Sequence, residues 1–303
     1  MRKGRVMEEM ISTNDGVIDF LSQTEDLPSL PQVISHILDV MDDVRSSVSD
    51  VATAAEQDPA ITAKILRIAN SSYYAARKEI TSVPYAIARM GQNEIRNMII
   101  SMGVITAMNK RGSGGLDYQR FWRHSLTVAI VARVINDFAD VDGRPARRRE
   151  NPFFVAGLLH DIGILVLDQN VDDLYASVVG HAAEHGQALH EVERRVLGAT
   201  HQEVGRMLCE KWRLPRIVAS AAAYHHEPFL APEDDQRVVK VVHVADLLAR
   251  QNGYGAYPVA SVDHVQEAVM KELGLDQVDR SLLDSTIHEA AEQSSVYRIL
   301  MDD

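Results

Sequence analysis

The chain has 303 residues, of which 46% are hydrophobic and 24% are charged, and its formal net charge is −12. This length and composition support one large or two ordinary folded domains and exclude a disordered chain. The acidic balance argues against general nucleic-acid binding, which needs a basic face, but it permits a small anionic ligand at a local cationic site. The single cysteine, Cys209, excludes a disulfide framework within the chain and favours a reducing cytoplasm.

No segment predicts export or membrane insertion. The N-terminal sequence MRKGRVMEEM lacks the apolar run of a signal peptide. The most apolar stretches, Val128–Ile135 and Val238–Leu248, are short and interrupted by charged residues. We therefore expect a cytoplasmic protein that makes no membrane contact.

The first half of the chain predicts a series of short helices. Residues 1–26 form a polar lead-in, and the turn signal LPSLP at Leu27–Pro31 precedes the first well-patterned helix. Asp58 and Pro59 are typical of an N-cap followed by proline in the first turn. The segment RGSGG, Arg111–Gly115, is the expected internal boundary. The helices predicted here are Val17–Leu21, Pro31–Met41, 49–55, Pro59–Ala69, 82–90 and one that Asn93 caps.

The second half is also predicted to be helical, with polar loops at Asp140–Glu150 and Asn252–Pro258. No β-rich run, alternating pattern or internal repeat interrupts it, so we expect an all-α fold. The helices predicted here are Tyr118–Phe138, 151–161, Val171–His185, His190–Gly198, His201–Trp212, Pro215–His226, Gln236–Gln251, Asp263–Leu273 and Asp279–Ala291.

The segment FFVAGLLHDIG, Phe153–Gly163, carries the first candidate site residues. An apolar helical stretch runs into His160 and Asp161, and Gly163 is expected to end that helix. A buried ionised carboxylate is normally paired or bound to a metal ion, so this pair needs partners. Other imidazoles and acids lie on apolar helical stripes or at helix ends elsewhere in the chain. The full candidate set is His124, His160, Asp161, His201, His225, His226 and Asp246.

Each candidate also has an ordinary structural interpretation. A lone core histidine such as His124 usually binds a backbone carbonyl, and Asp246 could form a salt bridge with an arginine. We favour a shared metal site because several imidazoles are expected to be buried, and binding to one common metal site would provide partners for all of them. Imidazole and carboxylate together suit Fe or Mn, with Zn or Ni as alternatives, rather than Ca. Seven candidates exceed one four-coordinate site, so one or two ions are expected, about 3.5–4 Å apart if two.

The remaining histidines are weaker candidates. His181, His185 and His190 lie on a polar stretch that is typical of a solvated helix face. His243 precedes Asp246 by three residues and is a weak candidate for a group that supports a metal ligand. Cys209 is expected to be inert packing.

The sequence resembles the HDOD family, a bacterial signalling relative of the HD and HD-GYP phosphohydrolases. The resemblance rests on LPSLPQV at 27–33, DPAITAKILRIANSSYY at 58–74, HQEVGRMLCEKWRLP at 201–215 and YHHEP at 224–228, together with the order of the candidate ligands. It implies an N-terminal helical bundle packed on an HD-type helical core. The implied divisions are a lead-in (1–26), an N-terminal subdomain (27–115), a metal-binding core (116–252) and C-terminal helices (253–303).

Three departures from the relatives bear on activity. Ile164 replaces the lysine that usually follows HDIG, Pro228-Phe229-Leu230 replaces the GYP signature, and Arg120 stands where some relatives have an acid. The resemblance therefore implies a signalling or output module that binds metal but is largely non-catalytic. Its expected partner is a protein of a signalling pathway or a small phosphorylated ligand.

Two alternatives remain. One is a metal-dependent phosphohydrolase acting on a nucleotide or cyclic dinucleotide, in which Asp161 bridges the ions and a nearby arginine replaces the missing lysine. The other is a helical scaffold with buried histidines and no ion.

Overall fold

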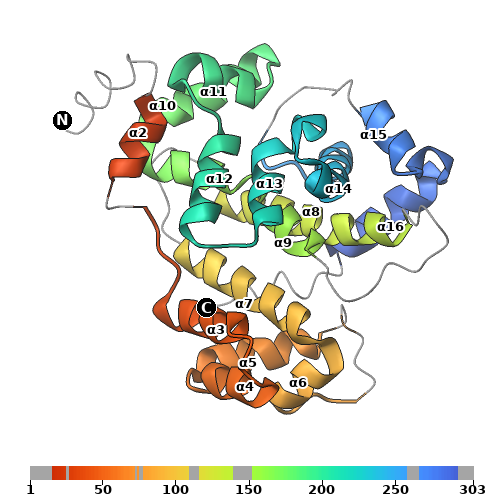
Figure 1. Cartoon of the computed structure of the whole chain (residues 1–303). Coiled ribbons are helices and arrows are strands. Elements are labelled where there is room, and N and C mark those ends of the chain that lie inside the picture. The colour runs from red at the N-terminus through yellow and green to blue at the C-terminus, as the bar shows by residue number, and fades with distance from the viewer. Residues whose placement is uncertain are drawn as a thin grey trace.

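The computed structural model describes residues 16–24, 27–71, 74, 78–108, 116–138, 152–257 and 266–292. Every regular element in these ranges is a helix, so the predicted all-α fold is confirmed (Figure 1). The predicted boundary Arg111–Gly115 and the predicted loop Asp140–Glu150 lie outside the described residues.

The N-terminal bundle, which lies below the rest of the molecule in Figure 1, comprises five helices in the described part of the chain. Their limits follow from local signals. The Asp58 side chain accepts hydrogen bonds from the backbone N of Ala60 and Ile61, and Pro59 occupies the first turn. Ser47 and Asp50 form a capping box at the start of another helix. The five helices are α3 (Gln32–Asp42), α4 (Val48–Glu56), α5 (Pro59–Ala69), α6 (Val83–Met90) and α7 (Gln92–Ala107).

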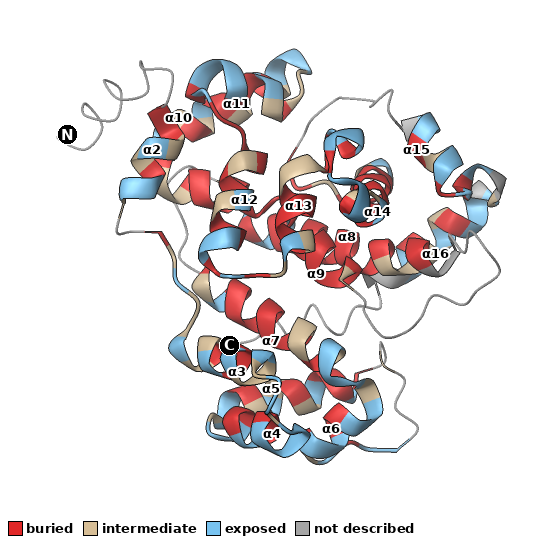
Figure 2. Ribbon diagram, viewed as in Figure 1, coloured by how far each residue is buried: buried red, intermediate tan, exposed pale blue. Residues whose placement is uncertain are grey.

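In the rest of the molecule the long helix α8 (Tyr118–Phe138) packs against α9 (Phe153–Leu159), α14 (Glu233–Gln251) and α16 (Arg280–Glu292). In Figure 2 the buried residues concentrate where α8, α9, α13 and α14 meet. The other elements are α2 (Gly16–Gln23), α9 (Phe153–Leu159), α10 (Ile162–His185), α11 (Leu189–Leu197), α12 (His201–Lys211), α13 (Arg216–Tyr224), η1 (Pro228–Leu230), α14 (Glu233–Gln251), α15 (Gln266–Glu272), η2 (Leu275–Gln277) and α16 (Arg280–Glu292).

The bundle and the core share a hydrophobic interior. One cluster of buried side chains extends from Leu21 of α2 through Ile99 of α7 to Val204 of α12. The Trp212 indole also donates a hydrogen bond of 2.9 Å to the backbone oxygen of Pro28, ahead of α3. Helix α2, in the predicted lead-in, thus buries its apolar residues in the same core as the rest.

Gly163 does not end a helix, contrary to the prediction. It lies in the first turn of α10, which begins at Ile162 and runs to His185 with a kink at Asp172 (φ 40°). The predicted helix Val171–His185 corresponds to the part of α10 that follows this kink. A Cβ atom on Gly163 would lie 2.0 Å from the backbone oxygen of His201. The glycine is therefore needed for the close approach of α10 and α12, and not for a helix end.

Several helix limits also differ from the predictions. Gly91, with φ of 90°, precedes α7 where Asn93 was expected to cap it, because only glycine adopts this conformation easily. Helix α13 ends at Tyr224, so His225 and His226 follow it. Helix α14 begins at Glu233, where Pro232 precedes a first turn rich in acids.

The segment Phe153–His185 is long and apolar enough to cross a membrane by composition, which the sequence analysis did not note. In the structure, 89% of its most apolar window is buried inside the protein. This burial is typical of helices in the core of a protein.

Candidate metal centre

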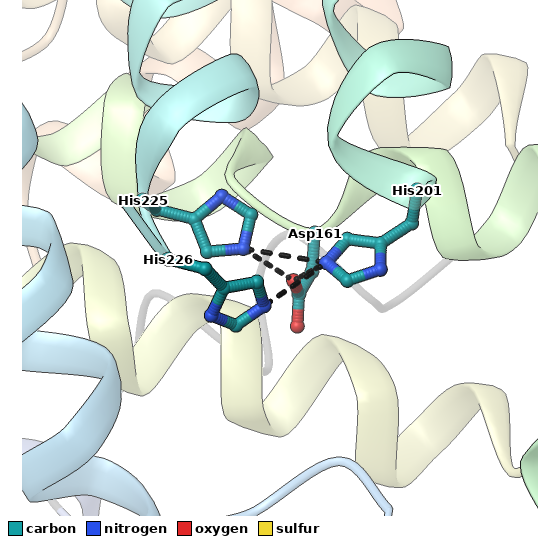
Figure 3. A group of neighbouring side chains, drawn as sticks. All are labelled: Asp161, His201, His225 and His226. Atoms are coloured by element: carbon teal, nitrogen blue, oxygen red, sulfur yellow. Dashed lines mark hydrogen bonds and ion pairs between the residues drawn. The ribbon is translucent and has the colours of Figure 1, made fainter. Parts of the chain in front are cut away.

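All seven predicted ligand residues meet at one place in the core. His226 is 7% exposed and the other six are 2% exposed or less. They come from α8, the turn between α9 and α10, the start of α12, the end of α13, and α14. Figure 3 shows four of them, with His201 and His225 directed at Asp161 and His226 directed at His201.

The first group of ligand atoms comprises Asp161, His201, His225 and His226. The Nε2 atom of His201 lies 3.4 Å from that of His225 and 3.2 Å from that of His226. Asp161 Oδ1 lies 3.4 Å from His201 Nε2 and 3.2 Å from His225 Nε2. Four atoms bound tetrahedrally to one ion at about 2.0–2.1 Å are roughly 3.3 Å apart. These four distances are those expected around a single tetrahedral ion, and all four ligand atoms lie within 4.8 Å of one another.

The second group comprises His124, His160 and Asp161, with Asp246 beside them. Asp161 Oδ2 lies 3.4 Å from His160 Nε2 and 3.7 Å from His124 Nε2. Asp246 Oδ1 lies 3.2 Å from His124 Nε2 and 3.7 Å from His160 Nε2. Asp161 thus directs one oxygen at each group, as a bridging carboxylate does.

Backbone carbonyls determine which nitrogen of three imidazoles carries a proton. The Nδ1 atoms of His124, His160 and His225 face the oxygens of Tyr254 (2.9 Å), Gly157 (2.7 Å) and Ala222 (3.0 Å). A carbonyl oxygen only accepts, so each Nδ1 donates and each neutral ring keeps its lone pair on Nε2. These lone pairs face carboxylate oxygens without a hydrogen between them, which is the donor set that a cation requires.

Two buried polar atoms at the centre make no hydrogen bond, His160 Nε2 and Asp161 Oδ1. Unsatisfied buried polar atoms are rare and costly in folded proteins. A bound ion would satisfy both atoms, so the residues present fit a divalent metal.

Glu193, which the sequence analysis missed, orients His201. One Glu193 oxygen accepts from His201 Nδ1 at 2.6 Å and from its backbone N at 2.8 Å. The other oxygen accepts from the Tyr175 hydroxyl at 2.6 Å. Glu193 is fully buried on α11. The apolar stripe of that helix, Leu189 and Leu197, places position 193 on the buried side, so the spacing contained the signal.

Burial and neighbouring charges set the ionisation of the centre. Burial lowers the pKa of His225 to about 3 and that of His226 well below its ordinary value. For His201 burial acts in the same direction, but the adjacent Glu193 outweighs it and raises the pKa. Burial favours the neutral form of Asp161, yet the imidazoles of His160 and its neighbours hold its pKa well below the usual range.

Asp246 has both of the partners considered for it. It faces His124, and it also forms a two-point ion pair with Arg250, one turn along α14.

The loop that follows α14 contributes as well. The Tyr257 hydroxyl lies 3.5 Å from Asp161 Oδ2, and burial raises the pKa of that hydroxyl well above its ordinary value. From the sequence, this segment was predicted only to be a loop.

The histidines that were weaker candidates as metal ligands differ in their exposure and contacts. His181 and His185 are exposed and stack on each other, as expected of a solvated helix face. His190 was assigned to the same face but stacks on His226, with ring centroids 4.4 Å apart. His243 Nδ1 donates to the backbone oxygen of His225 at 2.7 Å, so it supports the turn that carries two candidate ligands.

The structure also places the three positions at which this sequence departs from the HD and HD-GYP relatives. Ile164 is fully buried, so no cation occupies the place of the missing lysine. Pro228–Leu230 forms η1, in which Phe229 and Leu230 are exposed. Arg120 is exposed and donates to the backbone oxygen of Gly255 at 2.8 Å. Buried Cys209 has its pKa raised to about 12 by burial, in agreement with inert packing.

An all-helical chain with a bundle on a core that gathers His, His-Asp, His, His-His and Asp is of the HD-related class. The sequence model of the HDOD domain matches residues 27–228. The chain belongs to the HDOD family.

Solved structures share the fold. An HDOD domain protein of unknown function from Geobacter sulfurreducens is 24% identical, with a TM-score of 0.75, and 98% of this chain and 99% of that chain are covered. A protein of Shewanella amazonensis SB2B, provisionally named a phosphohydrolase, is 23% identical with a TM-score of 0.69, covering 92% and 97%.

A curated relative, an uncharacterized protein of Treponema pallidum, is 22% identical over 246 residues, or 81% of this chain. This chain matches 46% of that relative, so it spans about half of its length.

Proposed function

We propose that this chain is a bacterial signal-transduction output protein in which a buried divalent metal centre fixes the helical core. Fe or Mn is the favoured ion, with Zn or Ni as alternatives. The observation that carries the proposal is the convergence of seven ligand-type side chains, from five separate segments, at a place where none is more than 7% exposed. An ion there joins helices that are distant in sequence.

Such an ion acts primarily on stability. The candidate ligands meet only when the segments that carry them are assembled, so the free energy of metal binding adds to the free energy of folding. The N-terminal bundle then presents the recognition surface. Its partner is a protein of a signalling pathway or a small phosphorylated ligand in the cytoplasm.

The burial of the centre favours a structural role over catalysis. Substrate sites are concave and open, whereas Asp161 and the imidazoles around it lie within the core. Ile164 also supplies no charge for holding a phosphate. A largely non-catalytic module accounts for both features.

Metal analysis of untagged protein, prepared with Fe or Mn under anaerobic conditions, tests the proposal. We expect at least one ion per chain and no turnover of a generic phosphodiester such as bis(p-nitrophenyl) phosphate. Substoichiometric metal under every loading condition would instead support a metal-free scaffold.

One observation favours the alternative of a metal-dependent phosphohydrolase acting on a nucleotide or cyclic dinucleotide. Asp161 directs its two oxygens at two groups of ligands, an arrangement that suits two-metal phosphoryl chemistry. The provisional name of the Shewanella protein is in line with it. Turnover by the metal-loaded protein that is lost in Asp161→Ala would establish the enzyme, and no turnover with any metal would remove it.

A further inference from the structure

Arg250 pairs with Asp246, one of the two carboxylates among the candidate ligands. Its Nε atom donates to Asp246 Oδ1 at 2.8 Å, and its Nη2 atom contacts Asp246 Oδ2. The oxygen held by Nε is the same one that faces His124 Nε2 at 3.2 Å. A second metal ion, bound between His124, His160 and Asp246, must therefore compete with a two-point ion pair.

The first group has no such competitor. In the described part of the chain, the ion-pair partners of Asp161 are imidazoles, and the Tyr257 hydroxyl lies nearby. No described lysine or arginine contacts Asp161, His201 or His225 within ion-pair or hydrogen-bond distance. The two groups thus differ in direct ion pairing with a cation, although they share Asp161 and the charge of Arg250 also acts on His226.

The charge of the whole centre leads to the same conclusion. Asp161, Asp246 and Glu193 supply three carboxylates, and Arg250 supplies one guanidinium, which together leave two negative charges. One divalent ion balances them. A second ion would leave two positive charges in a core where unpaired charge is costly.

The pair forms without help from distant segments. Asp246 and Arg250 are separated by one turn of α14, the spacing at which helical side chains meet. The Arg250 side chain is 21% exposed, whereas Asp246 is 3% exposed. Arg250 lies at the edge of the core. Replacing it with a neutral residue therefore leaves the buried Asp246 carboxylate without its paired cation.

We propose that Arg250 makes this a single-ion centre: one divalent ion occupies Asp161, His201, His225 and His226, and Arg250 keeps Asp246 from binding a second. The inference rests on the proposed metal-binding function and specifies its occupancy. Arg250 is a positioning residue here, because it acts through Asp246 and not on the ion.

Metal stoichiometry tests the proposal with wild type, Arg250→Gln and the matched control Arg120→Gln. Arg120 contacts the loop after α14, at the Gly255 oxygen, and not Asp246. Each untagged, metal-stripped protein is dialysed against the same free Mn²⁺, and bound metal per chain is measured by mass spectrometry. We expect one ion in wild type and in Arg120→Gln, and two in Arg250→Gln. Electron paramagnetic resonance should show spin-coupled Mn²⁺ only in Arg250→Gln, because Asp161 would then bridge two ions.

Two results would overturn the inference: two ions in wild type, or one ion in an Arg250→Gln protein whose circular dichroism shows the native helix content. Asp246→Asn provides a second test. It should keep one ion and the wild-type rise of melting temperature with Mn²⁺, and loss of that ion would show that Asp246 is a ligand of it. Wild type that binds no ion under any condition would remove the proposed metal-binding function, a result distinct from two ions in wild type.

Discussion

One oxygen of Glu193 accepts hydrogen bonds from both the ring and the backbone nitrogen of His201, at 2.6 and 2.8 Å. The contact sets the direction of the His201 Nε2 lone pair toward Asp161 and makes the imidazole a stronger donor. Glu193 does not reach the proposed ion position, but it orients His201, which is a candidate ligand of that ion.

Replacing Glu193 with Gln should weaken metal binding. Loss of the carboxylate charge lowers the basicity of His201, and changes to such supporting groups cost about 10–100-fold in metal affinity. Competition with a fluorescent chelator measures the effect. The control is Glu191→Gln on the exposed side of the same helix, which should bind as wild type does. Equal affinity of all three proteins would contradict the role of Glu193.

Removing the ion should destabilise the wild-type protein. At a free-metal concentration about a thousand times the Kd, binding contributes about 4 kcal/mol to the free energy of unfolding. Chelation should abolish this contribution, and Asp161→Asn should show no difference with or without metal. Asp173→Asn, an exposed position on α10, should retain the full difference. Urea unfolding with and without chelator provides the measurement.

Gly163→Ala should be strongly destabilising. The added Cβ would lie 2.0 Å from the His201 oxygen and 2.7 Å from the Gly205 nitrogen, both backbone atoms that cannot rotate away. We expect a loss of at least about 3 kcal/mol, at the upper end for overpacking. Gly180→Ala is the control, since nothing lies within 4 Å of a Cβ there. That change should stabilise α10 by up to about 1 kcal/mol, because alanine is the better helix former.

The metal-free protein should lose stability as the pH falls below about 6.5. Burial lowers the pKa of His225 from 6.5 to about 3, so between these values the unfolded chain binds a proton that the folded chain does not. The free energy of unfolding therefore decreases with falling pH in this window. His201 acts in the opposite direction, because its pKa is raised and its proton favours the folded state.

Urea unfolding of chelated protein at several pH values measures this dependence. Replacing His225 with Gln should make the curve flatter between pH 6.5 and 3. A variant curve parallel to that of wild type would show that His225 is not the source of the dependence.

Cys209 should react with thiol reagents only when the protein unfolds. It is fully buried, and burial raises the pKa of its thiol to about 12, so almost no thiolate exists at neutral pH. The rate of reaction with a disulfide reagent in buffer and in denaturant tests this. Rapid labelling in buffer would place Cys209 at an accessible position.

The all-α fold and many helix limits could be predicted because local signals determine them. Asp58-Pro59 sets the start of α5, and α8 coincides with the predicted Tyr118–Phe138. The seven candidate ligands stood out because polar side chains on apolar stripes need partners, and the structure brings them together. Whether they bind metal remains a prediction.

The missed features depend on contacts between segments that are distant in sequence. Tyr257 lies in a loop whose path no local pattern specifies, yet its hydroxyl reaches Asp161 across 96 positions. Gly163 has the sequence character of a helix end, and only its contact with α12 shows why a side chain is excluded. Arg250 could have been found from its spacing to Asp246, but many surface pairs share that spacing.

Helix α12 connects the candidate metal centre to the segment that leads into the N-terminal bundle. His201 is its first residue, and Trp212, directly after its last, is hydrogen-bonded to Pro28 at the entrance to α3. Eleven residues of helix extend about 16 Å, and a packed helix moves as one body. We expect a shift of His201 at one end to move Trp212, and its hydrogen bond to Pro28 ahead of α3, at the other.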